Sequence, residues 1–284
     1  MRKKVLITLC IILNLAVAFG QKDSTTSSEK DYKTRGISVS PAHFHLTMNP
    51  GDVKIYSITV RNDTEKVNRF KVNIYDFNMN SKGKSGFLPA STGKYSLSKW
   101  LNVSPTFIEL AAGEKREVKF TVSLPFDSTA NRAAWSIIMV EQEEPKKTLE
   151  PVKNGDKTIA LGITPTFAFG IFVYQNPPNV TTNSIEITNF SKVAKDSVNT
   201  INIEAKNTGN GIAYCTSYID LTNLTNGKQQ RLMVKKFTIL PELTRVFSFT
   251  IPPTLEKGKY LAIGVLDYEG SEEIQAAKMN FEIN

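Results

Sequence analysis

The sequence of 284 residues has little of the chemistry that enzymes and metal sites use. It contains two cysteines and two histidines, and the histidines form a single H-x-H pair, His43 and His45. A metal site on that pair needs at least one further ligand, and no nearby residue suggests one, so we expect two edge-strand histidines and no metal or cofactor. The motifs G-x-S-x-G, C-x-x-C and the phosphate-binding loop do not occur. We therefore predict that the chain is not an enzyme and has no catalytic residues.

Other absences restrict partners and location. The 35 Lys and Arg are scattered among 27 Asp and Glu, without the basic stripe and interleaved aromatics that nucleic-acid binding uses. The one long apolar run, residues 5–19, is shorter than the roughly 20 residues of a membrane span. It follows a cationic head and ends in AFG, so residues 1–20 are predicted to be a secretory signal peptide. The mature chain is then expected in the periplasm or at the cell surface, with no transmembrane segment.

The cysteine count also limits how the exported chain is stabilised. Cys10 would leave with the signal peptide, so Cys215 alone remains and no internal disulfide is possible. We expect Cys215 to be a small buried residue on a strand; a reactive or intermolecular thiol is the alternative. Trp100 and Trp135 stand beside apolar residues and are expected to anchor the core rather than to bind a ligand.

What the sequence does contain is alternation. Residues 21–35 are polar and predict a flexible leader. Apolar and polar residues then alternate in several short segments, for example 118–124, 201–205 and 247–251, which is the period of half-buried strands. Turn residues separate these segments, and helical periodicity never exceeds about two turns. The pattern predicts an all-β protein made of two immunoglobulin-like β-sandwich domains in tandem.

Proline pairs and polar stretches indicate the domain boundary and the loops. Pro177 and Pro178 stop strand pairing and stiffen a connector, so the domains are predicted at residues 36–176 and 179–284. Residues 78–96, rich in Gly, Ser, Lys and Asn, and residues 143–157, charged and with two prolines, are predicted to be loops.

One segment of the first domain is unusual. In residues 158–174 (TIALGITPTFAFGIFVY) the odd positions are all apolar, and the even positions from 160 to 170 are all small. An edge strand of this kind can pair with a partner chain, with backbone bonds giving affinity and the apolar row giving register. A buried central strand is the alternative, although Pro165 cannot donate a ladder hydrogen bond.

The first domain resembles the PapD-like periplasmic pilus-chaperone family. The likeness lies in residues 51–63, 104–115 and 132–138, and in the apolar strand followed by Gln175-Asn176-Pro177. In that family the last strand complements an unfinished partner sandwich, which implies partner contacts at the matching positions Leu161, Ile163, Phe167 and Phe169. The family's Arg on the first strand and Lys on the last strand have no counterpart here, so its carboxylate clamp is not expected.

The second domain resembles adhesion-type immunoglobulin modules, and the order of the two modules is similar to that of WxL-interacting surface proteins. Together these resemblances imply a chaperone-like or assembly-scaffold protein of the bacterial envelope that binds an exported or outer-membrane protein by β-strand addition. The alternative is an adhesion module that binds peptidoglycan or another surface component.

Overall fold

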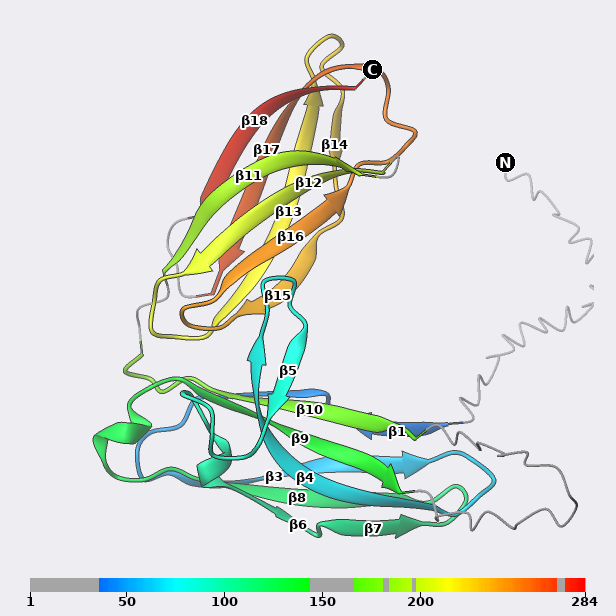
Figure 1. The fold of residues 1–284 in the computed structure, drawn as a ribbon, viewed down its shortest axis with the longest axis vertical. Coiled ribbons are helices and arrows are strands. Elements are labelled where there is room, and N and C mark those ends of the chain that lie inside the picture. The colour runs from blue at the N-terminus through cyan, green and yellow to red at the C-terminus, as the bar shows by residue number, and fades with distance from the viewer. Residues whose placement is uncertain (1–35, 144–165, 181–183, 196–197, 270–273, 284) are drawn as a thin grey trace, which may run out of the picture. The chain divides into compact units, whose positions relative to one another are not determined.

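The computed structural model describes residues 36–143, 166–180, 184–195, 198–269 and 274–283 (Figure 1). The predicted signal peptide and leader lie outside these ranges, as do Leu161 and Ile163. The described residues form eighteen strands and two single turns of 3-10 helix, Ser98–Trp100 and Ser128–Ala130. None of their helices is long and apolar enough to cross a membrane.

The first ten strands form two sheets that pack face to face (Figure 1). One sheet has the order β1 (Ile37–Ser40), β3 (Val53–Asn62), β8 (Lys115–Ser123), β6 (Leu101–Ser104). The other has the order β2 (His43–Leu46), β10 (Ala168–Gln175), β9 (Ala134–Glu143), β4 (Asn68–Met79), β5 (Ser85–Leu88), and β7 (Phe107–Leu110) also pairs with β4. All pairs are antiparallel except β10 with β2, which is parallel. The first two strands of the chain therefore lie in different sheets, β1 in one and β2 in the other.

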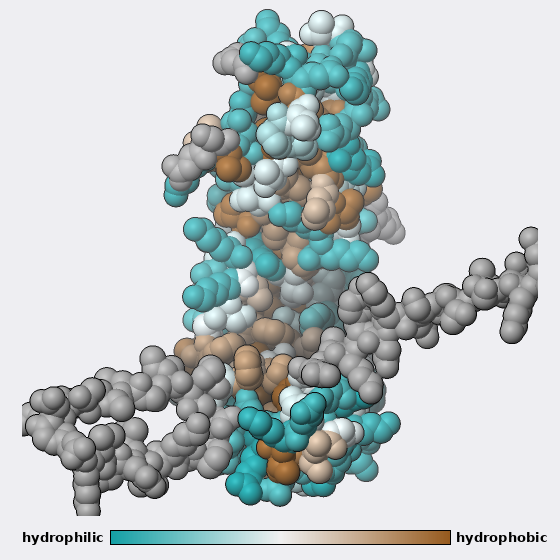
Figure 2. All heavy atoms as spheres, turned by 90° about the vertical axis from the view of Figure 1, so that its right-hand side faces the viewer, coloured by the Kyte–Doolittle hydropathy of each residue, from teal (hydrophilic) through white to brown (hydrophobic). Residues whose placement is uncertain are grey.

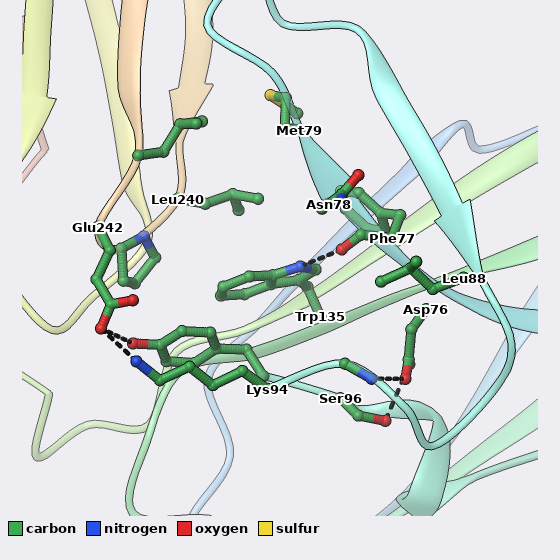
Figure 3. A pocket seen from close by; sticks show the side chains of 14 residues that line it. Asp76, Phe77, Asn78, Met79, Leu88, Lys94, Ser96, Trp135, Leu240 and Glu242 are labelled. Atoms are coloured by element: carbon green, nitrogen blue, oxygen red, sulfur yellow. Dashed lines mark hydrogen bonds and ion pairs between the residues drawn. The ribbon is translucent and has the colours of Figure 1, made fainter.

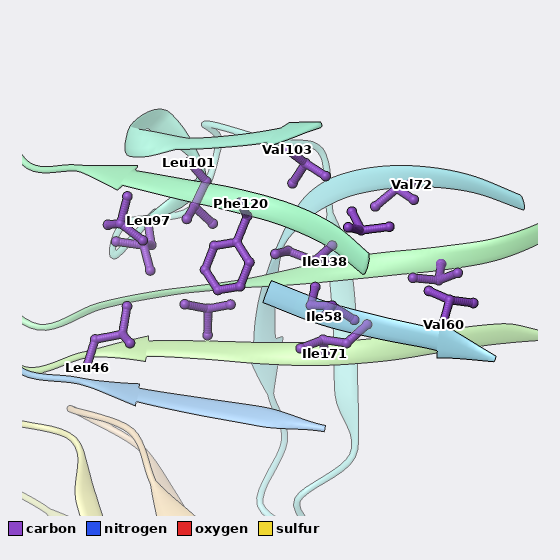
Figure 4. Close-up of a cluster of buried hydrophobic side chains, with 14 of the residues drawn as sticks. Leu46, Ile58, Val60, Val72, Leu97, Leu101, Val103, Phe120, Ile138 and Ile171 are labelled. Atoms are coloured by element: carbon purple, nitrogen blue, oxygen red, sulfur yellow. The ribbon is translucent and has the colours of Figure 1, made fainter. Parts of the chain in front are cut away.

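The alternation seen in the sequence explains this sandwich. On β8 the side chains of Val118, Phe120 and Val122 are buried, whereas Lys119 between them is exposed. These residues pack in one apolar cluster with Ile58 of the neighbouring strand β3 and with Ile138 and Ile171 of the facing sheet (Figure 4). Each fully buried side chain of this size contributes about 1.5–3 kcal/mol of hydrophobic free energy, so the cluster holds the two sheets together.

The remaining strands form a second sandwich with its own core. One sheet has the order β11 (Ile185–Lys195), β12 (Val198–Asn207), β16 (Thr244–Thr250). The other has the order β14 (Gln229–Arg231), β13 (Ala213–Asn223), β17 (Gly258–Tyr268), β18 (Gln275–Ile283), and β15 (Lys235–Ile239) also pairs with β13. Along β13 buried and half-buried residues strictly alternate. The predicted fold class, all-β with two immunoglobulin-like sandwiches in tandem, is confirmed.

A buried asparagine ends a strand in each sandwich. Asn62 is fully buried at the end of β3; its Nδ2 donates to the carbonyl oxygens of Lys66, Leu110 and Ala111 at 2.7, 3.1 and 2.9 Å. Asn207 ends β12, and its Nδ2 donates to the carbonyl oxygens of Gly211 and Ile239. Because buried carbonyl groups need partners, each asparagine holds a loop against the end of its sandwich.

Several local expectations can be compared with the structure. Cys215 is buried on β13 and unpaired, as expected, and Trp135 is buried while Trp100 packs partly buried against the first core. The loop predicted for residues 78–96 was wrong in part, because the end of β4 and β5 form a hairpin there, with Gly83 supplying a positive φ at the turn. Its polar composition had hidden the strand pairing. The other predicted loop, residues 143–157, lies almost entirely outside the described residues.

Candidate functional site: a partly covered strand edge

β10 is covered along only half of one edge. On one side it pairs with β9 over its whole length, Ala168 to Gln175. On the other side it pairs with β2 only from Phe172 to Gln175. Within the described part of the chain, no strand pairs with residues 168–171 on the side away from β9. This stretch is therefore an open strand edge, the feature that allows pairing with another chain.

The register shows which backbone groups point toward the open side. The N–H of Gln142 on β9 donates to the carbonyl oxygen of Phe167, whereas the N–H of Phe172 donates to the carbonyl oxygen of Ala42, next to β2. In an antiparallel ladder, a residue's N–H and C=O both point to one side, and that side alternates along the strand. Odd-numbered residues of β10 therefore bond to β9. The N–H and C=O groups of Ala168 and Gly170 point to the open side.

The side chains of the odd residues form the apolar row that the sequence showed. Ile171 and Val173 are buried in the core of the first sandwich, and Phe169 packs partly buried against it. Phe167 continues the row where the core ends, and its exposed fraction is 60%. The apolar row therefore begins with side chains buried in the protein's own core and ends with the solvent-exposed ring of Phe167.

The other face of β10 carries small residues at the open end and aromatics at the covered end. Ala168 is exposed. A Cβ on Gly170 would lie 2.7 Å from Cδ1 of Ile137 on β9, so a side chain there would need the end of the Ile137 side chain to move. Phe172 and Tyr174 follow, in an apolar cluster that also contains Trp135. Beside the open edge this face of β10 therefore carries little side-chain bulk of its own.

The structure describes two of the four residues predicted to bind a partner. Phe167 lies exposed just before β10, and Phe169 lies on the strand itself. Leu161 and Ile163 are outside the described residues, so their role stays a prediction. The sequence-based prediction considered side chains only and so did not include Ala168 and Gly170, whose backbone N–H and C=O groups point to the open edge. The row of small residues at even positions was the available signal for them.

The histidine pair lies on β2, the strand that covers the other half of the edge. Both rings are exposed, and they point to the side of Phe172 and Tyr174: His43 lies 6.5 Å from the first ring and His45 lies 5.5 Å from the second. Partial burial, and then the neighbouring His43, lower the pKa of His45, while Glu269 opposes this. Among the described residues no group of three His, Cys, Asp or Glu could hold a metal ion.

A pocket of about 250 Å³ lies beside Trp135 (Figure 3), and no histidine or cysteine lines it. Most of its polar side chains are hydrogen-bonded to one another or to the backbone. Trp135 Nε1 donates to the carbonyl oxygen of Phe77 at 2.9 Å, Asp76 accepts from Ser96 Oγ at 2.9 Å, and Glu242 accepts from Lys94 Nζ and Tyr95 Oη at 2.6 and 3.0 Å. These bonds fix the walls of the pocket in place.

Among the described residues, the face drawn in Figure 2 carries no broad apolar surface. On the face drawn in Figure 2, hydrophobic residues lie in several small groups among hydrophilic ones. Single exposed apolar residues such as Phe107 and Phe126 are normal for protein surfaces. The open edge of β10 therefore stands out by its unpaired backbone, with Phe167 beside it.

Several solved structures to which the chain is similar are chaperones of fimbriae or pili. A class 5 fimbriae chaperone, CfaA, is 16% identical, with 86% of this chain and 98% of that chain covered and a TM-score of 0.44. A CsuC–CsuE chaperone–tip adhesion subunit pre-assembly complex from archaic chaperone–usher pili of Acinetobacter baumannii contains a chain that is 13% identical, with coverages of 85% and 97% and a TM-score of 0.44. The E. coli chaperone DraB is 14% identical, with coverages of 88% and 96% and a TM-score of 0.40.

The fimbrial chaperones belong to the family that the first domain was predicted to resemble. No family model matches the chain, and no curated protein matches it in sequence. Since the TM-scores are below 0.5, the function is argued from the strand edge alone.

Proposed function

We propose that this chain is a non-enzymatic, chaperone-like or assembly-scaffold protein of the bacterial envelope that binds a partner polypeptide by β-strand addition along β10. The partner would be an exported or outer-membrane protein, and the place of action the periplasm or the cell surface. The observation that carries the proposal is the edge of residues 168–171, which pairs with β9 and with no other described strand. The two domains, residues 36–176 and 179–284, would act as one binding unit.

The backbone supplies the affinity in this proposal. Ala168 and Gly170 each offer one N–H and one C=O to the open side, in the direction set by the ladder with β9. Each added hydrogen bond contributes about 0.5–1.5 kcal/mol net, so four such bonds give about 4 kcal/mol. That is a useful part of a binding free energy but too little for a stable complex by itself.

The apolar row supplies the rest. An added strand would lie beside Phe167, whose ring is 60% exposed, and burying most of a phenylalanine contributes about 1.5–3 kcal/mol. Leu161 and Ile163 continue the same row of odd positions in the sequence, which is why we retain them with Phe167 and Phe169 as the proposed partner contacts. Alternate side chains then give register and selectivity.

A proline at residue 168 tests the backbone half of the proposal. Ala168→Pro removes the N–H that points to the open side, and it leaves the bonds of residues 167 and 169 to β9 in place. The tagged full-length chain would be purified from the native envelope, and captured proteins identified by mass spectrometry. We expect a partner that is captured by the natural chain and by Ala168→Thr, which keeps the N–H, and that is lost with Ala168→Pro.

Hydrogen exchange on the resulting complex then locates the contact. We expect the amides of Ala168 and Gly170 to become protected when the partner binds, because they would enter a ladder. A partner that binds Ala168→Pro as well as the natural chain, or that leaves these two amides unprotected, would show that strand addition along β10 is not the mechanism.

A charge at residue 167 tests the side-chain half. Phe167→Glu should weaken capture about ten-fold or more, since it places a carboxylate where an apolar contact is proposed. Phe107→Glu on β7 makes the same change at a residue that is 47% exposed and away from β10. Equal binding by the two variants, with unchanged unfolding curves, would remove Phe167 from the site.

A further inference from the structure

A second concave surface lies around the strands β12, β15 and β16 of the second sandwich and the turn between β4 and β5. It is a groove of about 860 Å³, within the size range of ligand sites. None of its lining residues comes from β10. The lining residues are Ser81, Lys82, Val193, Lys195, Val198, Thr200, Asn202, Lys235, Lys236, Phe237, Arg245, Val246, Phe247 and Ser248.

The groove is strongly cationic, because its lining contains five basic residues and no aspartate or glutamate. The basic residues are Lys82, Lys195, Lys235, Lys236 and Arg245, and none of them forms an ion pair with a described carboxylate. Some basic residues elsewhere do form ion pairs, as Lys94 does with Glu242 and Arg231 with Asp220. Concentrated charge of one sign with no internal partner attracts a ligand of the opposite sign.

The backbone of this groove is already partly engaged. β16 is the edge strand of its sheet, but the N–H of Val246 donates to the carbonyl oxygen of Ser81 at 2.8 Å. The carbonyl oxygen of Ser248 accepts from Lys235 Nζ. These two bonds interrupt a continuous ladder along β16, which favours an occupant held by side chains, such as a polymer with charged and hydroxyl groups, over an added β-strand.

The floor of the groove carries small polar groups in register. Asn202 lies opposite Ser248 across the β12–β16 pair. Thr200 stands two residues before Asn202 on β12, so its side chain lies on the same face. Oδ1 of Asn202 and Nε of Arg245 are buried atoms without a hydrogen-bond partner among the described residues. The first is an acceptor for hydroxyl groups and the second a donor to anionic oxygens. A ligand that carries both would satisfy them after small side-chain rotations.

An aromatic surface completes the wall. The rings of Phe237 and Phe247 stack with centroids 3.5 Å apart, and the guanidinium of Arg245 lies 5.7 and 5.4 Å from them. Phe237 is only half-buried, so part of its ring remains open to an apolar face of a ligand. Sugar rings combine such a face with hydroxyl groups around their edge.

From the charge, the polar floor and the partly engaged backbone together, we propose that this groove binds an acidic polysaccharide, a chain of sugars bearing carboxylates. The lysines and Arg245 contact the carboxylates, and Thr200, Asn202 and Ser248 contact hydroxyl groups. No residue of β10 lines this site, so the protein would hold a polypeptide at the strand edge and an acidic glycan in the groove.

Binding of polygalacturonate to the full chain tests the proposal, with isothermal titration calorimetry as the measurement. Lys195→Gln/Lys236→Gln removes two exposed charges from the groove and should weaken binding about ten-fold. The matched control Lys257→Gln/Lys259→Gln removes two exposed charges outside it and should leave the affinity within about two-fold. Raising the salt from about 0.05 M to about 0.5 M should weaken binding, because the ion pairs are exposed to solvent.

Binding of other polymers distinguishes an acidic glycan from other classes of ligand. Neutral dextran should not bind, and polyglutamate should bind more weakly than polygalacturonate. Equal affinity for polyglutamate would assign the groove to an acidic peptide, and equal loss in both double variants would mean non-specific charge attraction; either result overturns the proposal. Ala168→Pro should bind polygalacturonate normally, so failure of the strand-addition proposal would be seen separately.

Discussion

Replacing Asn62 with aspartate changes one buried donor group into an acceptor. The natural Nδ2 donates to three carbonyl oxygens, those of Lys66, Leu110 and Ala111, and the residue is fully buried. Nδ2 carries two hydrogens, so these contacts amount to about two full hydrogen bonds, and their loss at about 1 kcal/mol each gives about 2 kcal/mol. The carboxylate then faces the same carbonyl oxygens without a donor, so we expect a total loss of about 3–5 kcal/mol. A typical domain has about 5–15 kcal/mol of stability.

Tryptophan fluorescence allows this loss to be measured in one sandwich. Trp100 packs against the first core, whereas Trp135 also shares a cluster with Ile212 and Leu240 of the second sandwich. The fluorescence of Trp100 during urea unfolding, recorded in a Trp135→Phe background, therefore reports the first sandwich. Asn102→Asp is the matched control, because it makes the same chemical change at an exposed residue on β6. It should alter the free energy of unfolding by less than about 0.5 kcal/mol.

The pH dependence gives a further check on Asn62→Asp. A protonated aspartic acid keeps one O–H donor for the carbonyl oxygens, so burial should raise the pKa of this carboxyl in the folded variant. A folded pKa above the unfolded value means that the variant regains stability as pH falls through the folded pKa. If the variant unfolds at the same urea concentration as Asn102→Asp, the loop carbonyls do not depend on Asn62 and the reasoning is wrong.

Two further predictions concern buried titratable groups. In a Cys10→Ser background, Cys215 should not react with Ellman's reagent at pH 8 until urea unfolds the chain, because burial raises the pKa of the thiol to about 12; rapid reaction of the folded protein would contradict its burial. Burial likewise raises the pKa of Tyr174 to about 12, against a nearby Arg245 that lowers it, while an unfolded tyrosine has a pKa of about 10. Because the unfolded state ionises first, the free energy of unfolding should fall as pH rises from about 10 to about 12, and Tyr174→Phe should reduce that fall; an unchanged slope would show that Tyr174 is accessible.

The sequence predicted the fold well because its pattern is local. Alternation such as that of Val118, Phe120 and Val122 sets which face of a strand is buried, and each sandwich follows from several such strands. The hairpin of β4 and β5 was missed, since residues 78–96 are rich in Gly, Ser, Lys and Asn, and the few apolar residues among them, such as Met79 and Phe87, set no sustained alternation. Pairing there depends on turn geometry at Gly83, which composition alone does not show.

The candidate site was only partly predictable. The apolar row that includes Phe167 and Phe169 is visible in the sequence, but the row itself does not show where the protein's own core ends. That point depends on contacts distant in sequence, between Ile171 or Val173 and strands such as β3 and β8. Which half of β10 is covered depends on β2, more than 120 residues earlier, and no local pattern reports that pairing.

The parallel contact of β2 with β10 has a geometric consequence for any strand added to this sheet. β2 occupies the edge from Phe172 onward, and the carbonyl oxygen of Ala42 is already bonded to the N–H of Phe172. An added strand therefore has to end before Ala42, because the edge of β10 is already hydrogen-bonded from that point onward. Along the described residues 166–171 there is room for about 20 Å of extended chain at about 3.3 Å per residue. Lengthening β2 backward by design would shorten that space, and so would set how much of a foreign strand the sheet accepts.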